Sequence, residues 1–248
     1  MPDWAREYFE RGYGQRWGLK PPSDQVRLEA DGLYRLLNLT STSRVIDVAC
    51  GHGRHAVSLA ERGLDVVGLD FAAALLSRAR DIASDLRAPV RLVRGDMRQL
   101  PFRNGCADAV IVMDAFGFFE TDEEHDAILR EAARVLASGG RLGLKIVNGN
   151  FVLDGFRENE QEERDGAVIS VSRTLTHGPT RMTERLSISG PRGHGEYERH
   201  QRLYRVEELA AAIERVGVTV VGVFAAPDGT PFDPAASSTM WIVGERYK

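Results

Sequence analysis

The sequence lacks several features that would place it in a specialised class of protein. Among 248 residues only Cys50 and Cys106 are cysteines, too few for a disulfide framework and not at metal-ligand spacing, so we expect reduced thiols. No hydrophobic run approaches the roughly 18 residues of a membrane span, and residues 1–17 lack the apolar core of a signal peptide. These absences predict a cytoplasmic protein without a membrane anchor.

The chain also lacks an excess of basic charge. Its 32 Lys and Arg against 36 Asp and Glu give a formal net charge of -4. A nucleic-acid partner is therefore unlikely on charge alone, although a local basic patch is compatible with this total. The length, with 43% hydrophobic and 27% charged residues, is typical of one large globular α/β domain.

Hydrophobic strand patterns alternate with helical patterns through the first part of the chain. Strands are expected at residues 44–49, 64–70, 90–96, 107–114 and 141–147. Helices are expected at residues 23–39, 54–62, 72–86 and 122–136. This order predicts an α/β fold with a doubly wound, mostly parallel sheet, whose ligands bind beyond the carboxyl ends of the strands.

After residue 148 the pattern changes to alternating polar and apolar residues around Gly and Pro turns, which predicts an inserted antiparallel β layer. A last helix follows, and then strands at 218–224 and 238–245 that bring the main sheet to seven. With no helix between them these two strands should form an antiparallel hairpin, although the loop at 225–237 is just long enough for a parallel crossover.

We expect a single domain, 1–248, made of four segments. These are N-terminal lid or helices at 1–40, a cofactor-binding core at 41–148, the inserted layer on the substrate side at 149–205, and the last helix with the terminal strands at 206–248.

The stretch VIDVACGHGRHAVSLA, residues 45–60, marks the first ligand-binding feature. Gly51 and Gly53 lie where a strand becomes a helix, so backbone can approach a ligand and the helix amino end faces it. The turn also matches G-x-G-x-x-A, a form of the dinucleotide fingerprint. By itself it leaves open a nicotinamide cofactor, another nucleotide-like ligand, or only a tight turn.

Three carboxylates narrow that choice. Asp47, Asp70 and Asp96 each lie at the end of a successive predicted strand. A carboxylate after the second strand can accept from both ribose hydroxyls, and one after the third can accept from an exocyclic amine such as that of adenine. Each alone could be a turn or cap, but three on one rim predict an adenosine site.

In this pattern the chain resembles the class I S-adenosylmethionine-dependent methyltransferases over residues 45–147, through DVACGHG, GLD and GDM. The resemblance implies S-adenosyl-L-methionine as cofactor, which also suits Asp47, a carboxylate that a pyrophosphate binder would not explain. The residues it implies for the cofactor are Asp47, Ala49, Gly51, Gly53, Asp70, Phe71, Asp96, Met97, Met113 and Asp114. Ala49 replaces the family's first glycine, which is tolerable if its φ is negative.

The acceptor side is less defined. Methyl transfer is an in-line displacement that needs positioning more than a general base, so the catalytic residue is unknown, with Asp114, His200 and Tyr204 as candidates. Substrate-side candidates are Tyr13, Trp17, Phe116 and His200. The N-terminal aromatics would form a lid, as in similar small-molecule methyltransferases, or pack an amphipathic helix on the sheet.

We therefore predict a methyltransferase that modifies a small molecule at N, O or C. The segment MDAFGFFE lacks the prolines of the [DN]-P-P-[FYW] motif of base-amine methyltransferases, which argues against a DNA substrate. The alternatives are an RNA or protein methyltransferase, a nicotinamide-dependent oxidoreductase, and a non-catalytic cofactor-binding module. We expect no metal site, and the sequence does not predict the oligomeric state.

Overall fold

The computed structural model describes residues 3–176, 178 and 180–247; residues 1–2, 177, 179 and 248, which belong to the predicted lid, insert and terminal segments, lie outside the described residues. The helices are α1 (Asp3–Glu7), the π-helical η1 (Tyr8–Gly12), α2 (Tyr13–Trp17), α3 (Asp24–Leu36), α4 (Arg54–Ala60), α5 (Ala73–Asp85), α6 (Asp122–Val135), α7 (Gly149–Asp154) and α8 (Val206–Arg215). The strands are β1 (Arg44–Val48), β2 (Asp65–Asp70), β3 (Val90–Arg94), β4 (Ala107–Met113), β5 (Leu136–Val147), β6 (Asn159–Arg164), β7 (Ala167–Thr176), β8 (Arg181–Gly190), β9 (Gly193–Arg202), β10 (Val218–Phe224) and β11 (Thr239–Arg246).

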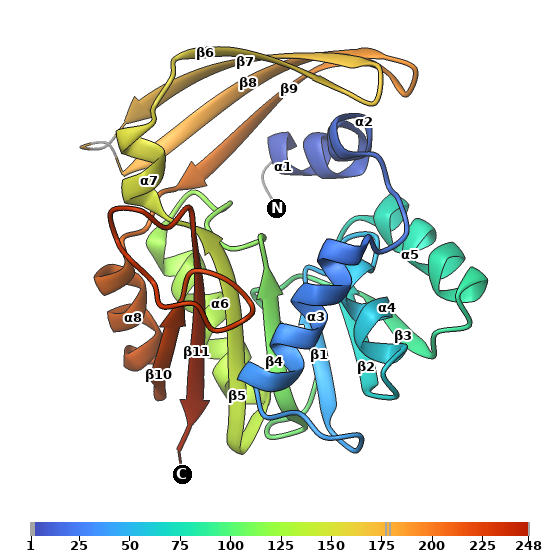
Figure 1. The fold of residues 1–248 in the computed structure, drawn as a ribbon, viewed down its shortest axis with the longest axis vertical. Coiled ribbons are helices and arrows are strands. Elements are labelled where there is room, and N and C mark those ends of the chain that lie inside the picture. The colour runs from blue at the N-terminus through green and yellow to red at the C-terminus, as the bar shows by residue number, and fades with distance from the viewer. Residues whose placement is uncertain (1–2, 177, 179, 248) are drawn as a thin grey trace.

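The main sheet has seven strands in the order β10-β11-β5-β4-β1-β2-β3. Strands β1 to β5 pair in parallel, and β11 pairs antiparallel with both β5 and β10. The predicted doubly wound sheet and its antiparallel terminal hairpin are therefore confirmed. Helices α3, α4 and α5 bury one face, and α6 with α8 buries the other (Figure 1). This two-sided burial explains why β1 and β4 read as unbroken hydrophobic runs.

The predicted inserted layer is also confirmed, as a second antiparallel sheet with the order β6-β7-β8-β9. One boundary was wrong, because residues 149–154 form α7 before the first inserted strand begins. Asn148 explains the helix: its side-chain oxygen accepts from the amide of Asn150 at 3.1 Å and caps the first turn. The insert arches over the carboxyl ends of the parallel strands (Figure 1).

The N-terminal helices α1, η1 and α2 lie between the insert and the main sheet (Figure 1). Tyr8, only 1% exposed, packs against the inner face of the insert. The insert residues in this cluster are Ile169, Val171, Leu186, Ile188 and Tyr197. The helices therefore gain their burial mainly from the insert, while α3 packs on the main sheet. Within the described residues no helix combines the length and the hydropathy needed to cross a membrane.

Candidate active site

A cavity of about 730 Å³ lies at the carboxyl ends of β1, β2 and β4, beneath the N-terminal helices and the insert. The predicted site residues that line it are Tyr13, Trp17, Asp47, Ala49, Gly51, Asp70, Phe71, Asp96, Met97, Met113, Asp114 and Phe116. Gly53, His200 and Tyr204 do not line it. The strand-end residues thus come together as their order along the sheet requires.

Ala49 departs from expectation, because its φ is +57° and not negative. The chain must turn sharply between β1 and α4, and the amide of Cys50 in this turn donates to the carbonyl of Leu69 on β2 at 3.0 Å. A left-handed conformation costs a non-glycine residue about 1–2 kcal/mol. Gly51, at φ +58°, adopts the same region without that cost. The methyl group of Ala49 is therefore accommodated in a conformation that favours glycine.

Gly53 shapes the turn without reaching the cavity. It is the N-cap of α4 with φ +81°. A Cβ atom there would lie 3.0 Å from the Cβ of Ala79 on α5. The glycine therefore permits close packing of α4 against α5, and this packing sets the position of the turn that Gly51 presents to the cavity.

Asp70 is fixed by two backbone amides. One carboxylate oxygen accepts from Gly51 at 2.8 Å, and the other accepts from Ala72 at 2.9 Å. The residue is 5% exposed, and burial raises the pKa of its carboxyl group. Because each carboxylate oxygen has further lone pairs, the group can still accept from two ligand hydroxyls.

Asp47 has a buried oxygen that no described group satisfies. The residue is 1% exposed, and its Oδ2 atom has no hydrogen-bond partner within the described chain. Burial raises its pKa to about 7. A buried acceptor without a partner is costly, so a cationic donor entering the cavity would be stabilised here.

Asp114 belongs to a chain of charged side chains that begins at the wall of the cavity. Its Oδ2 atom accepts from Arg54 at 2.8 Å and from Lys145 at 3.1 Å, and Lys145 also donates to Glu29 at 3.0 Å. Glu29 in turn bonds to His55 at 2.7 Å. Burial opposes ionisation of Glu29, but His55 and Lys145 outweigh it and lower its pKa to about 2. Asp114 is thus held by two cations.

Asp96 lies at the third strand end, next to Met97. Arg98 donates to both of its oxygens, at 2.6 Å to Oδ2 and 3.0 Å to Oδ1. Burial raises the pKa of this carboxyl group, but the contacts with Arg98 outweigh burial and lower it. Asp96 lines the cavity, and its ionised carboxylate can accept from a ligand amine.

His52 and His55 have separate environments. His52 lines the cavity, with its ring centroid 6.2 Å from that of Tyr13, and burial lowers its pKa to about 4. His55 also borders the cavity, but its Nε2 atom is bonded to the carboxylate of Glu29. In the described part of the chain, no three His, Cys, Asp or Glu side chains are grouped to hold a metal ion.

His200 faces away from the cavity. Its neighbours Arg199 and Gln201 on β9 line the cavity, and successive side chains of a strand point to opposite faces. The His200 ring lies 4.9 Å from Trp4, and its Nε2 atom is 2.6 Å from the carboxylate of Glu198. The placement of His200 beside the acceptor is therefore wrong.

Tyr204 also lies outside the cavity, where its hydroxyl is 2.8 Å from Nδ1 of His125. The amide of Phe119 donates to Nε2 of the same ring at 3.1 Å. Burial lowers the pKa of His125 to about 4, so the neutral ring carries its proton on Nδ1 and donates it to Tyr204. These two side chains support the loop at 116–119 from behind, and Tyr204 is not placed to accept a proton from an acceptor.

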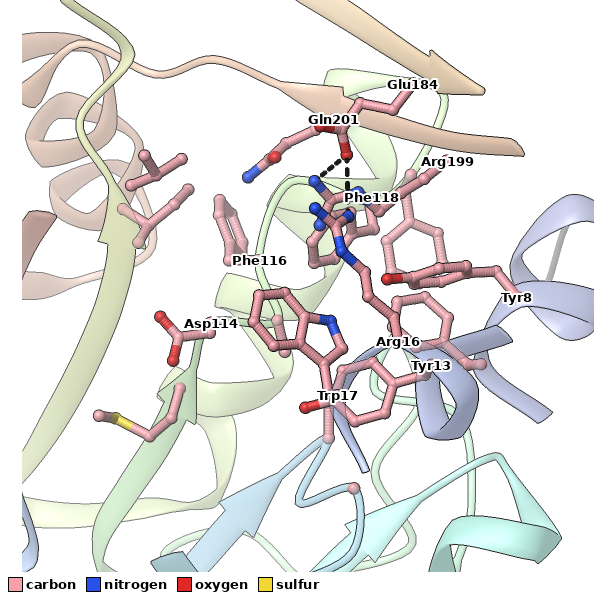
Figure 2. A pocket seen from close by; sticks show the side chains of 18 of the residues that line it. Tyr8, Tyr13, Arg16, Trp17, Asp114, Phe116, Phe118, Glu184, Arg199 and Gln201 are labelled. Carbon is pink, nitrogen blue, oxygen red and sulfur yellow. Dashed lines mark hydrogen bonds and ion pairs between the residues drawn. The ribbon is translucent and has the colours of Figure 1, made fainter. Parts of the chain in front are cut away.

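The sequence did not single out the polar residues at the other end of the cavity. Figure 2 shows Arg16, Glu184, Arg199 and Gln201 beneath the insert, facing Phe116. Glu184 and Arg199 are cross-strand partners on β8 and β9. Only the pairing register could have identified them, since neither belongs to a local motif.

Comparisons with known proteins agree with this geometry. Residues 45–140 match the family model described as a methyltransferase domain. The chain is 44% identical over 101 residues to demethylmenaquinone methyltransferase of Thermus thermophilus, covering 40% of this chain and 44% of that protein. It is 27% identical over 199 residues to dTDP-3-amino-3,4,6-trideoxy-alpha-D-glucopyranose N,N-dimethyltransferase of Streptomyces venezuelae, covering 75% and 80%. It resembles the structure of the CcbJ methyltransferase from Streptomyces caelestis with a TM-score of 0.81 at 19% identity, covering 97% and 98%.

The fold, the strand-end carboxylates and the match of residues 45–140 to a methyltransferase domain are together those of the class I S-adenosylmethionine-dependent methyltransferases. The cofactor is S-adenosyl-L-methionine, so the nicotinamide alternative is wrong. The match to the Thermus thermophilus protein spans less than half of that relative.

Proposed function

We propose that this protein transfers the methyl group of S-adenosylmethionine to a nitrogen, oxygen or carbon nucleophile of a small molecule. One observation carries the proposal: a single cavity joins the strand-end carboxylates to a second compartment beneath the insert. A covered cavity of this kind excludes water and aligns two small reactants, which is the main requirement of in-line displacement.

The cofactor residues fit this reaction. Asp47, with its unpartnered oxygen, would accept from the ammonium group of the methionine part. Asp70 would accept from the ribose hydroxyls, while Asp96 with Met97 and Phe71 would contact the adenine. When bound, S-adenosylmethionine supplies an electrophilic methyl group on a positively charged sulfur. These contacts would direct that methyl group toward Phe116 and the compartment beyond it.

No base is needed if the acceptor reaches the cavity as a neutral amine or an anion. Of the three candidates, only Asp114 lines the cavity, and Arg54 and Lys145 already engage its carboxylate. We infer that Asp114 positions the methionine end of the cofactor through Arg54, and that catalysis depends on alignment.

The remaining alternatives fit the geometry less well. A non-catalytic module would be expected to have its acceptor space filled by the aromatics around Phe116, but Phe116 lines open volume. An RNA or protein acceptor needs a groove that admits a chain, whereas residues of both the N-terminal helices and the insert help to enclose this cavity. The relatives are named for demethylmenaquinone and for a nucleotide-linked amino sugar, which supports a small acceptor. We also propose that the four predicted segments act as one domain in the cytoplasm.

Methyl-labelled S-adenosylmethionine tests the proposal. The purified protein is incubated with a panel of small amines, phenols and carboxylic acids, and separately with bulk RNA and with protein. We expect labelled product and S-adenosylhomocysteine from at least one small molecule, and neither from Asp70→Ala. Label that enters only RNA or protein would overturn the choice of acceptor.

A further inference from the structure

We propose that the acceptor carries an anionic oxygen group, a carboxylate or a phosphate, which Arg16, Arg173 and Arg199 bind at the end of the cavity beneath the insert. This inference rests on the proposed function, because it names the substrate class of the same cavity. The observations that carry it are an uneven distribution of charge along the cavity and two buried arginine donors without partners.

The two ends of the cavity carry opposite charge. The ionisable Asp and Arg residues lining the cofactor end are Asp47, Asp70, Asp96, Asp114 and Arg54. Those lining the end beneath the insert are Arg16, Arg157, Arg173, Arg199, Glu160 and Glu184. Four arginines against two glutamates leave the second end positive in a chain whose net charge is -4. Such a field attracts an anionic acceptor and opposes a cationic one.

Three of these arginines surround one buried carboxylate. Glu184, whose side chain is 3% exposed, accepts from Arg173 Nε at 2.8 Å and pairs with Arg199 through its other oxygen. Arg16 Nη1 lies 3.8 Å from that second oxygen, beyond hydrogen-bond distance. Burial disfavours the charge of Glu184, but the arginines outweigh burial and lower its pKa. Glu184 thus contacts three guanidinium groups, while Arg173 also pairs with Glu160 at 2.8 Å.

Two guanidinium N–H groups of this cluster are buried and have no hydrogen-bond acceptor among the described residues. The side chain of Arg16 is 7% exposed and donates through Nε to Glu162 at 3.0 Å. Its Nη1 atom, and Nε of Arg199, have no hydrogen-bond partner among the described residues. Unsatisfied buried donors on a charged group are costly. A planar or tetrahedral oxyanion matches guanidinium geometry and would accept from the arginines that line the cavity.

The aromatic and amide side chains beside Arg199 indicate which chemical group the oxyanion is attached to. The guanidinium of Arg199 lies 5.5 Å from the ring centroid of Phe118, and Phe116 faces the same space (Figure 2). Gln201 adds an amide beside them. The compartment therefore suits an oxyanion attached to an aromatic or apolar body. The cluster could also serve only to clamp α2 to the insert, which is the competing explanation that the test must separate.

Benzoate and phenyl phosphate are suitable probes, because each joins an oxyanion to a ring, and benzamide is a neutral isostere of benzoate. Dissociation constants are measured by NMR titration with the protein saturated with S-adenosylhomocysteine. We expect wild type to bind the better oxyanion about tenfold more tightly than benzamide. The preferred oxyanion distinguishes a carboxylate from a phosphate. Equal affinities, or no binding of any probe, would overturn the proposal.

Variants test which residues are responsible. Arg173→Gln and Arg199→Gln should each reduce the preference for the oxyanion to nearly nothing. Glu184→Gln removes the competing carboxylate and should tighten benzoate binding about threefold, whereas a purely structural clamp predicts no gain. Arg192→Gln is the matched control: Arg192 donates to the carbonyl of Gln15 at 2.9 Å, so it also joins α2 to the insert, but it does not line the cavity. A preference that survives in both cavity variants would contradict the assignment.

Binding of S-adenosylhomocysteine is measured first and independently. If it binds and the oxyanion preference is absent, the anionic subsite is wrong and the proposed methyltransferase function stands. If it fails to bind, the proposed function itself fails. The wild-type comparison of benzoate with benzamide does not depend on the folding of any variant.

Discussion

The carboxylate of Asp70 accepts a hydrogen bond from the backbone amide of Gly51 at 2.8 Å. This contact joins the end of β2 to the turn that follows β1, so the acidic residue and the glycine of the cofactor motif hold each other in place. The Asp70 carboxylate, which can accept from a ligand, and the Gly51 turn, which lets the backbone approach that ligand, therefore form one structural unit.

Asp70→Asn should weaken binding of S-adenosylhomocysteine by about tenfold or more. The amide keeps the shape but replaces one acceptor oxygen with a donor, which faces either the Gly51 or the Ala72 amide. Calorimetric titration measures the loss. Asp65→Asn is the control, since Asp65 lies at the opposite, exposed end of β2. Unchanged affinity in Asp70→Asn would contradict the assignment.

Binding of the cofactor should release protons near pH 7 through Asp47. Its pKa of about 7 leaves about half of the free protein protonated there, and a bound ammonium group would favour the carboxylate. Titrations in two buffers of different ionisation enthalpy measure the released protons. Asp47→Asn should abolish the release. Equal proton release in this variant and in wild type would exclude Asp47 as its source.

Stability should fall in acid because of His52 and His125. Both have a folded-state pKa of about 4, below the unfolded value, so the stability they contribute is present above about pH 6.5 and is lost as the pH falls toward 4. Each shift corresponds to about 3 kcal/mol. Urea unfolding at several pH values should show a shallower decline in His125→Gln. The control His194→Gln changes an exposed histidine and should leave the decline as it is.

Tyr8→Ala should loosen the N-terminal helices from the insert. Removing a buried aromatic side chain costs about 3–5 kcal/mol where the site cannot collapse. Because Tyr8 packs against strands of the insert, the loss should be local. Hydrogen exchange of residues 3–17 should accelerate, while amides of β1 and β4 stay protected. Tyr247→Ala, at an exposed position, is expected to leave both unchanged.

Ala49→Gly should stabilise the protein slightly. The substitution removes about 1–2 kcal/mol of left-handed strain from the folded state. It also costs about 0.5–1 kcal/mol, because glycine has more conformational entropy to lose on folding. Urea unfolding should therefore show a net gain. Ala211→Gly, at an exposed position within the right-handed helix α8, should instead lose about 1 kcal/mol. A loss of stability in Ala49→Gly would contradict the strain assigned to this turn.

Most of the fold could be predicted because its signals are local. Strands β1 and β4 are buried on both faces and therefore uniformly hydrophobic, while the insert alternates because one face meets Tyr8 and the other meets solvent. Two local details were wrong. The φ of Ala49 depends on the path of the chain into α4, and α7 depends on the cap that Asn148 supplies.

The grouping of the strand-end carboxylates in one cavity was predictable for the same reason. Asp47 lies near the end of β1, Asp70 ends β2 and Asp96 follows β3, and parallel topology brings these strand ends together. The acceptor side is made by contacts distant in the chain: Arg16 meets Glu162 and Glu184 only once the N-terminal helices lie under the insert. The misplacement of His200 has a related cause, since alternation shows that neighbours face opposite ways but not which of them faces the cavity.

The central claim is that this cavity binds S-adenosylmethionine through its strand-end carboxylates. Calorimetric titration of S-adenosylhomocysteine into wild-type protein and Asp70→Ala tests it most directly. We expect binding to wild type with a dissociation constant on the order of micromolar, and a loss of most of that affinity in Asp70→Ala. Absence of binding to wild type up to millimolar ligand, or equal binding by the two proteins, would contradict the claim.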